Sequence, residues 1–127
     1  MINIEDIKNL KKCAIESKSQ LATLACKINN EEIFKKKNIV KVITENEISN
    51  EKNSRAKQFL REVSERQNYF IYHHVGIYIY SISTLKKFVN LKPTKNEISK
   101  NLEQLRALEN NIIIDVIYAN SSPIGVD

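Results

Sequence analysis

One stretch constrains the fold more than any other: the run from Asn68 to Ser81, which is dense in tyrosine, isoleucine and valine. Aromatic and β-branched side chains of this kind favour a β-strand, and a strand this long needs partner strands along its edges. A single glycine, Gly76, interrupts the run, which predicts either a β-bulge or a close approach of another backbone. We therefore expect a sheet built around this stretch.

Three further runs have the length and composition of strands, and helices are predicted between them. The strands are expected at Gln20–Ile28, Asn38–Thr44 and Ile112–Tyr118, and the helices at Ile4–Ser17, from Asn29 or Asn30 to Phe34, and from a Ser83 cap to Val89. Alternation of helix and strand favours an α/β layered domain. No linker or internal repeat interrupts residues 1–127, which predicts a single domain.

The stretch from Glu45 to Gln67 gives the weakest signal. It is polar, and the apolar residues in its second half have mild helical spacing (Ala56, Phe59, Leu60 and Val63). We expect a loop followed by a helix or by irregular chain.

A well-capped helix is predicted from Thr94 to Asn110. Thr94, followed three residues later by Glu97, is the signature of a capping box. Steps of 100° place four apolar residues on one core-facing arc: Ile98, Leu102, Leu105 and Leu108. Glu109 falls on the same arc, so it is expected to be partly buried and to need a partner.

The same helix carries polar side chains beside its apolar arc. Gln104 and Glu97 lie on one shoulder of the arc, Arg106 lies on the other, and Glu103 points away from it. The helix is therefore expected to pack on a sheet while its polar groups line a cleft.

The charge of the chain bears on its partners. The net charge is +5, and excess positive charge favours nucleic acid when it clusters on one face. Here lysine is spread along the chain, and the one tight run, Lys35–Lys37, is expected to be solvated. A small basic nucleic-acid-binding module is the alternative and would need exposed aromatic residues. Because Tyr78 and Tyr80 fall in an apolar strand pattern, no nucleic-acid partner is predicted.

The remaining composition favours a cytoplasmic protein. Cys13 and Cys26 have no metal-like spacing and are interpreted as small buried thiols in a reducing compartment. The sequence has no run of about 18 apolar residues, so no membrane span is expected. Residues 1–12 mix acidic and basic side chains and do not form a secretory signal.

Several motifs, taken in their order and spacing, resemble one family. They are His74-Val75-Gly76-Ile77-Tyr78, Leu85–Val89, Leu102–Glu109 and Gly125-Val126-Asp127, with Leu21–Ala25, Val40–Ile43 and Ser54-Arg55-Ala56 as further similar segments. Together they resemble 3-deoxy-manno-octulosonate cytidylyltransferase (CMP-Kdo synthetase), and they cover nearly the whole chain but only the second half of the family. The resemblance implies an α/β fold with a partial mixed sheet and flanking helices, the C-terminal half of a nucleotide-diphospho-sugar transferase (Rossmann-like) fold.

The resemblance also implies an activity and a site. The family joins the acidic sugar Kdo to CMP, with CTP as donor and pyrophosphate as product, for lipopolysaccharide synthesis. The implied substrate-binding residues are Arg55, His74, Glu103 and Gln104, the implied Mg²⁺ ligand is Asp127, and no catalytic residue is assigned. Each also has an ordinary interpretation: His74 as a hydrogen-bonded strand residue, Glu103 as a solvated helix residue and Asp127 as an exposed chain end.

Departures from the family pattern predict little or no activity for this chain alone. The nucleotide-binding N-terminal half would be missing, with its glycine-bearing loop and one metal-binding aspartate, and the chain has only Gly76 and Gly125. Lys100 stands where the family usually has an acidic residue. We therefore expect a truncated cytidylyltransferase domain, either inactive or working with a complementary N-terminal half as a split enzyme, and a homodimer is a further expectation. Missing strands also predict an unpaired apolar sheet edge.

Overall fold

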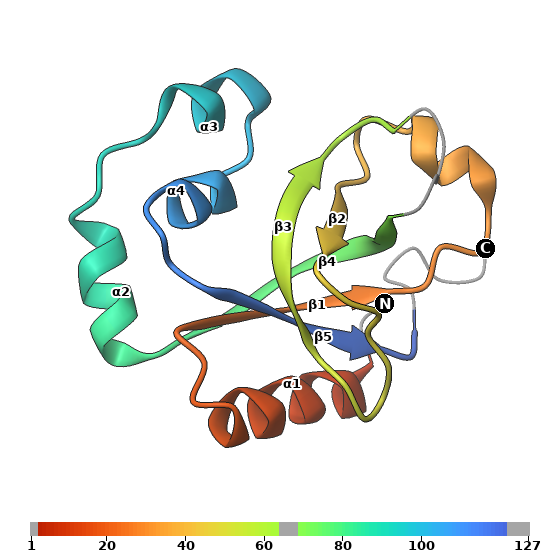
Figure 1. Ribbon diagram of the computed structural model, residues 1–127, viewed down its shortest axis with the longest axis horizontal. Coiled ribbons are helices and arrows are strands. Elements are labelled where there is room, and N and C mark those ends of the chain that lie inside the picture. The colour runs from red at the N-terminus through yellow and green to blue at the C-terminus, as the bar shows by residue number, and fades with distance from the viewer. Residues whose placement is uncertain (1–2, 64–68, 122–127) are drawn as a thin grey trace.

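The computed structural model describes residues 3–63 and 69–121 (Figure 1). They form α1 (Ile4–Glu16), β1 (Leu21–Cys26), the 3₁₀ turn η1 (Glu31–Lys35), β2 (Lys41–Thr44), β3 (Ser54–Leu60), β4 (Phe70–Tyr80), α2 (Ile82–Val89), α3 (Lys95–Lys100), α4 (Gln104–Glu109) and β5 (Ile114–Ala119). The predicted alternation of helix and strand is confirmed over most of the chain. The cap of α2 is Ser81 and not Ser83, because the Ser81 hydroxyl accepts the amide hydrogen of Thr84 at 3.2 Å.

The five strands form one mixed sheet that closes into a barrel in the order β1-β4-β2-β3-β5. β1 and β5 are parallel, and the other neighbouring pairs are antiparallel. The closing contact is short, with Ser54 opposite Val116 and Arg55 opposite Asp115. The predicted unpaired apolar edge is therefore wrong for the described strands, because β3 and β5 pair with each other.

Gly76 lies at a β-bulge, which was one of the two predictions for this glycine. The register between β4 and β1 shifts between Thr23 and Leu24. The Thr23 hydroxyl donates to the Ile77 carbonyl at 2.7 Å. This carbonyl, which the interrupted strand pairing leaves free, therefore has a hydrogen-bond donor. A Cβ atom on Gly76 would have no heavy atom within 4 Å, so no other backbone approaches closely. The bulge adds the twist and curvature that barrel closure requires.

Residues 54–60 form strand β3, and the prediction of a helix or irregular chain there is wrong. Ala56 and Phe59 are both buried in this strand. The register with β2 shifts so that Lys57 is left out of the pairing. This bulge spaces the buried residues by three instead of two, and so it imitates the periodicity of a helix.

Apolar side chains pack on both faces of the sheet. Helices α2 and α4 cover the larger cluster, which includes the buried Ala107 and Val116. On the other face, α1 packs Leu10 and Ala14 against β1 and β5. A third, smaller cluster surrounds Phe34 of η1. Figure 1 shows α1 running alongside β1 and β5, with α2, α3 and α4 grouped on the other side of the strands.

The helix predicted over Thr94–Asn110 is two helices, so the prediction of one continuous helix is wrong. The predicted capping box is present, with the Thr94 hydroxyl and the Glu97 carboxylate each accepting the other residue's amide hydrogen. At Asn101 the backbone turns left-handed, with φ 54° and ψ 49°, and α3 ends. The amide of Leu102 then donates to the Glu97 carbonyl at 3.1 Å. Together with the left-handed residue, this bond forms the helix end known as a Schellman motif.

The break changes which side chains face the core. Leu102 is 3% exposed and Ile98 is 69% exposed, whereas a continuous helix would place residues four apart on one face. Glu109 is exposed, which corrects its predicted partial burial. Its carboxylate does have partners, since it accepts hydrogen bonds from the Thr94 hydroxyl at 2.6 Å and the Asn96 amide at 2.8 Å.

Other sequence predictions concern the lysine run, the thiols and the membrane. The side chains of Lys35–Lys37 are exposed, as predicted. Neither cysteine forms a disulfide within the described structure; Cys26 is buried as predicted, and Cys13 is only half-buried. Burial, and then the nearby Glu16, raise the pKa of the Cys13 thiol. Within the described residues, no helix has the length and apolar character needed to cross a membrane.

Candidate functional site

Five rings form a continuous row that links the sheet to α2, and we call them the ring row. The centroids of neighbouring rings are 5.1 Å, 5.5 Å, 6.4 Å and 5.5 Å apart along the order Phe59, His74, Tyr78, Tyr80 and Phe88. The first ring comes from β3, the next three from β4 and the last from α2. Edge and tilted ring contacts of this kind are favourable, so the row holds α2 against the sheet.

His74 is a buried, neutral member of the ring row. It is 7% exposed, and its Nε2 lies 2.9 Å from the Thr23 hydroxyl. Because that hydroxyl has one proton and donates it to the Ile77 carbonyl, we assign the His74 Nε2–H as the donor. Burial, with a smaller contribution from His73, lowers the pKa of His74 to about 3. The imidazole therefore carries no charge at pH 7 and has the environment of a structural histidine.

Glu103 and Gln104 stand at the start of α4. Gln104 is 9% exposed, and Glu103 is exposed. Burial, then the neighbouring Tyr80, then the negative charge of Glu103 raise the pKa of Tyr78; burial and Glu103 also raise the pKa of Tyr80. The start of α4 therefore offers a carboxylate and an amide, and both tyrosine hydroxyl groups belong to half-buried side chains.

A charged pair that the sequence analysis missed holds this region together. The Glu97 carboxylate accepts two hydrogen bonds from the Arg106 guanidinium, at 2.9 Å from Nε and 2.5 Å from Nη2. These bonds lower the pKa of Glu97. The Arg106 guanidinium carbon also lies 4.9 Å from the centre of the Phe88 ring. The pair therefore joins α3 to α4 and both to the end of the ring row.

Arg55 lies apart from the other predicted substrate-binding residues. It is exposed on β3 and lines a cleft of about 240 Å³ with Glu45, Leu108 and residues 111–114. Glu103 lines a different cleft of about 450 Å³, whose other lining residues are Pro93, Glu97, Ile98, Asn101, Leu102 and Arg106. The structure thus places His74 in the ring row and puts Glu103 and Arg55 in two different clefts.

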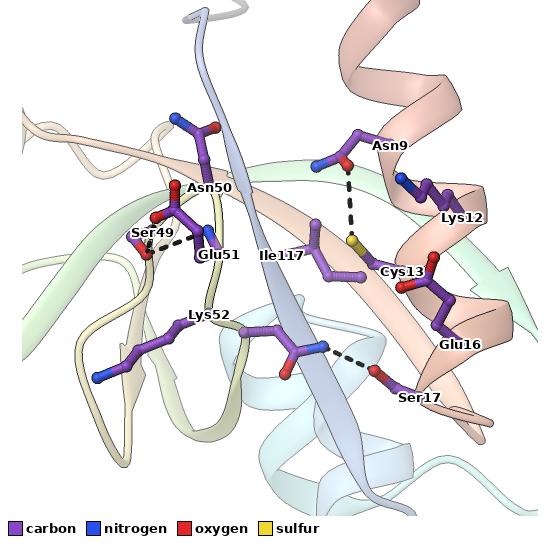
Figure 2. Close-up of a pocket in the computed structure, with 11 residues that line it drawn as sticks. Asn9, Lys12, Cys13, Glu16, Ser17, Ser49, Asn50, Glu51, Lys52 and Ile117 are labelled. Carbon is purple, nitrogen blue, oxygen red and sulfur yellow. Dashed lines mark hydrogen bonds between the residues drawn. The ribbon is translucent and has the colours of Figure 1, made fainter.

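A further cleft of about 330 Å³ separates α1 from the turn at residues 49–53 (Figure 2). The Asn53 amide donates to the Ser17 hydroxyl across it at 3.0 Å. Each side contributes one lysine and one glutamate: Lys12 and Glu16 from α1, and Lys52 and Glu51 from the turn. The charges of the two sides balance, so the lining does not select a ligand of one sign. None of the predicted substrate-binding residues lines this cleft.

The predicted metal site was tested against the described side chains. Within residues 3–63 and 69–121, no three His, Cys, Asp or Glu side chains gather where they could hold a metal ion. Mg²⁺ prefers oxygen ligands, commonly one or two carboxylates with phosphates and water. Asp127, the predicted ligand, lies outside the described residues. The described residues therefore form no metal cage from protein groups alone, and the assignment of Asp127 stays a prediction.

Comparison with known proteins defines the class. Residues 1–115 match the family model described as cytidylyltransferase, so the chain belongs to this family. More narrowly, it is 41% identical over 113 residues to the 3-deoxy-manno-octulosonate cytidylyltransferase of Bartonella tribocorum, and 43% identical over 111 residues to that of Bartonella henselae. The resemblance inferred from the sequence motifs is confirmed. These matches cover 86% and 87% of this chain but 44% and 45% of the relatives, so the chain spans less than half of their length.

A solved structure supports the same grouping. The structure of a CMP:2-keto-3-deoxy-manno-octonic acid synthetase complexed with CTP superposes with a TM-score of 0.81 and 26% sequence identity. The superposition covers 100% of this chain and 52% of that one. The predicted α/β fold with a mixed sheet and flanking helices, related to nucleotide-sugar transferases, is thereby confirmed.

Proposed function

We propose that this chain is a cytidylyltransferase domain that provides the sugar-binding wall of a CMP-Kdo synthetase. In that reaction the anomeric hydroxyl of Kdo attacks the α-phosphorus of CTP. An oxygen–phosphorus bond forms, the bond to pyrophosphate breaks, and the hydroxyl loses its proton. The curated relatives carry the name of this enzyme, and the similar solved structure is a complex with CTP. The observation that carries the proposal is the cleft at the start of α4, which Glu103 lines together with Arg106, the residue whose guanidinium packs on Phe88 of the ring row.

The side chains of this region suit a polyhydroxylated acid. The Glu103 carboxylate accepts hydrogen bonds from sugar hydroxyls, and the Gln104 amide both donates and accepts. Tyr80 offers a hydroxyl donor beside them. His74, being neutral and buried, serves as the support behind the tyrosines and does not pair with the sugar carboxylate. The guanidinium fork of Arg55 matches a carboxylate or a phosphate; because Arg55 lines a different cleft from Glu103, we assign a phosphate to it.

The proposal extends to partners and cofactor. In the split-enzyme alternative, a second polypeptide carries the CTP-binding half, and we propose this arrangement for testing. A homodimer is a second arrangement that we propose for testing. Asp127 remains the proposed Mg²⁺ ligand, together with groups outside the described residues. A reaction that consumes CTP suits the cytoplasm, where we place the chain.

Sugar binding can be tested on this chain alone. We expect titration of the ¹⁵N-labelled chain with Kdo to shift the amide signals of Tyr80, Glu103 and Gln104. Glu103→Gln should weaken the affinity about tenfold, because a hydrogen bond to a charged acceptor contributes about 1.5 kcal/mol or more. Glu51→Gln, which changes an exposed carboxylate in the cleft beside α1, is the matched control. Absence of shifts at millimolar sugar would reject the sugar-binding wall.

Catalysis needs a separate assay. Pyrophosphate release is measured with CTP, Kdo and Mg²⁺, first with this chain alone and then with the remaining half of the Bartonella henselae relative added. We expect release only from the mixture, and chelation of Mg²⁺ should abolish it. No release from the mixture would remove the split-enzyme alternative.

A further inference from the structure

We infer that Arg61 is a positioning residue: its guanidinium fixes the corner between α3 and α4 from which Glu103 and Gln104 project. The link to sugar binding rests on the function proposed above. The corner is a separate structural feature, so it can be tested whether or not the chain binds a sugar.

The guanidinium of Arg61 binds three backbone carbonyls from two distant segments. Its Nε donates to the Lys100 carbonyl at 2.8 Å and its Nη2 to the Asn101 carbonyl at 2.7 Å. Its Nη1 donates to the Lys37 carbonyl at 2.9 Å, in the turn before β2. One side chain therefore ties the C-terminal end of α3 to the end of β3 and to the turn before β2. Hydrogen bonds from a charged donor are stronger than those between neutral groups.

The two carbonyls at the corner are ones that a continuous helix would use for its own hydrogen bonds. In a continuous helix each carbonyl accepts from the amide four residues later, so the Lys100 carbonyl would bind the amide of Gln104 and the Asn101 carbonyl that of Leu105. Arg61 occupies both acceptors instead. It therefore stabilises the corner against the continuous helix that the sequence pattern favours, and it leaves the start of α4 free to face the ring row.

The backbone of Arg61 is itself held by a hydrogen bond to a buried side chain. Its carbonyl accepts a hydrogen bond from the ammonium of Lys41, which is fully buried in β2 and also donates to the Lys36 carbonyl at 2.6 Å. On the other side, α3 and α4 are tied to each other by the Glu97–Arg106 pair. The two helices thus form one bonded unit, and Arg61 is a polar link from the sheet to that unit. Removing the link should loosen the unit while the barrel stays folded.

The test compares Arg61→Gln with the control Lys57→Gln. The control also removes one positive charge, from an exposed side chain of β3, but it leaves the three hydrogen bonds of Arg61 to the carbonyls intact. Amide hydrogen exchange is followed by NMR across the chain. In Arg61→Gln we expect exchange at Leu102, Leu105 and Ala107 to accelerate on the order of tenfold, with β1 and β5 unchanged. Arg61→Lys keeps the charge but has no fork, so an intermediate acceleration is expected. Lys57→Gln should exchange like the unchanged chain.

Two readouts separate this inference from the proposed function. Unchanged exchange at the corner in Arg61→Gln, or acceleration spread evenly over the whole chain, would overturn the positioning role. If the unchanged chain binds Kdo, its dissociation constant should rise about tenfold in Arg61→Gln and stay constant in Lys57→Gln; an unchanged constant would also overturn the role. If the unchanged chain binds no Kdo, the proposed function fails, and the exchange data alone decide the role of Arg61.

Discussion

Stability should fall between pH 7 and pH 5 because His74 is buried without its proton. Its pKa is lowered from 6.5 to about 3, mainly by burial. Below pH 6.5 the unfolded chain binds a proton at this position and the folded chain does not, so acid favours the unfolded state. The penalty is absent above pH 6.5, grows as the pH falls, and levels off near pH 3.

The size of the effect follows from the shift. Each pH unit within this window changes the free energy of unfolding by about 1.4 kcal/mol, so about 2 kcal/mol is lost by pH 5. The sequence has 2 histidines, and His73 adds a loss of the same sign because burial and Lys41 lower its pKa as well. Carboxylates titrate mostly below this window, and the lowered pKa values of Glu97 and Glu109 move them further away.

Urea unfolding followed by circular dichroism at pH 7, 6 and 5 measures this dependence. His74→Gln keeps a polar side chain beside Thr23 without the titration, so its free energy of unfolding should change less with pH. His73→Gln is the matched control and should retain the loss of about 2 kcal/mol assigned to His74. Equal stability of the unchanged chain at pH 7 and pH 5, or an undiminished slope in His74→Gln, would refute the reasoning.

Substitutions at three further positions test hydrogen bonding, ion pairing and helix capping by the same urea unfolding. Asp6 is 4% exposed and accepts three hydrogen bonds from the chain just after β5, so Asp6→Ala should lower the free energy of unfolding by about 2–3 kcal/mol; Asp6→Asn, which keeps one acceptor, should lose less. Glu97→Gln should lose about 1–2 kcal/mol by leaving the Arg106 guanidinium without its carboxylate, and no loss would show that the pair is fully solvated. Asn101→Gly should be neutral or slightly stabilising and Asn101→Ala destabilising by about 1 kcal/mol, because φ is 54° there; the reverse order would contradict the left-handed corner.

Local signals in the sequence predicted much of the fold. The dense β-branched and aromatic run predicted β4, and the single glycine predicted its bulge. The capping box at Thr94 and Glu97 was predicted because both partners lie within one helical turn. These features depend on residues that are close together in the sequence, so a local sequence pattern is enough to predict them.

The errors occur where distant residues override local preference. The bulge in β3 exists because β2 pairs with it, and its shifted spacing looks helical from the sequence alone. Barrel closure depends on Ser54 and Arg55 meeting β5, about 60 residues further along the chain. In each case the deciding partner lies far away in the sequence.

The candidate site depends on one such event, the break at Asn101. On a continuous helix Glu97 and Arg106, nine residues apart, would point in opposite directions, and Glu103 would face away from the apolar arc. Because α3 ends in a left-handed residue, α4 starts in a new direction, and Glu97 and Arg106 form a two-point pair. Glu103 lines one cleft with Arg106, whose guanidinium packs on Phe88 of the ring row. If the break were removed, the helix would keep its apolar face and still lose the arrangement of polar groups on which sugar binding is proposed to depend.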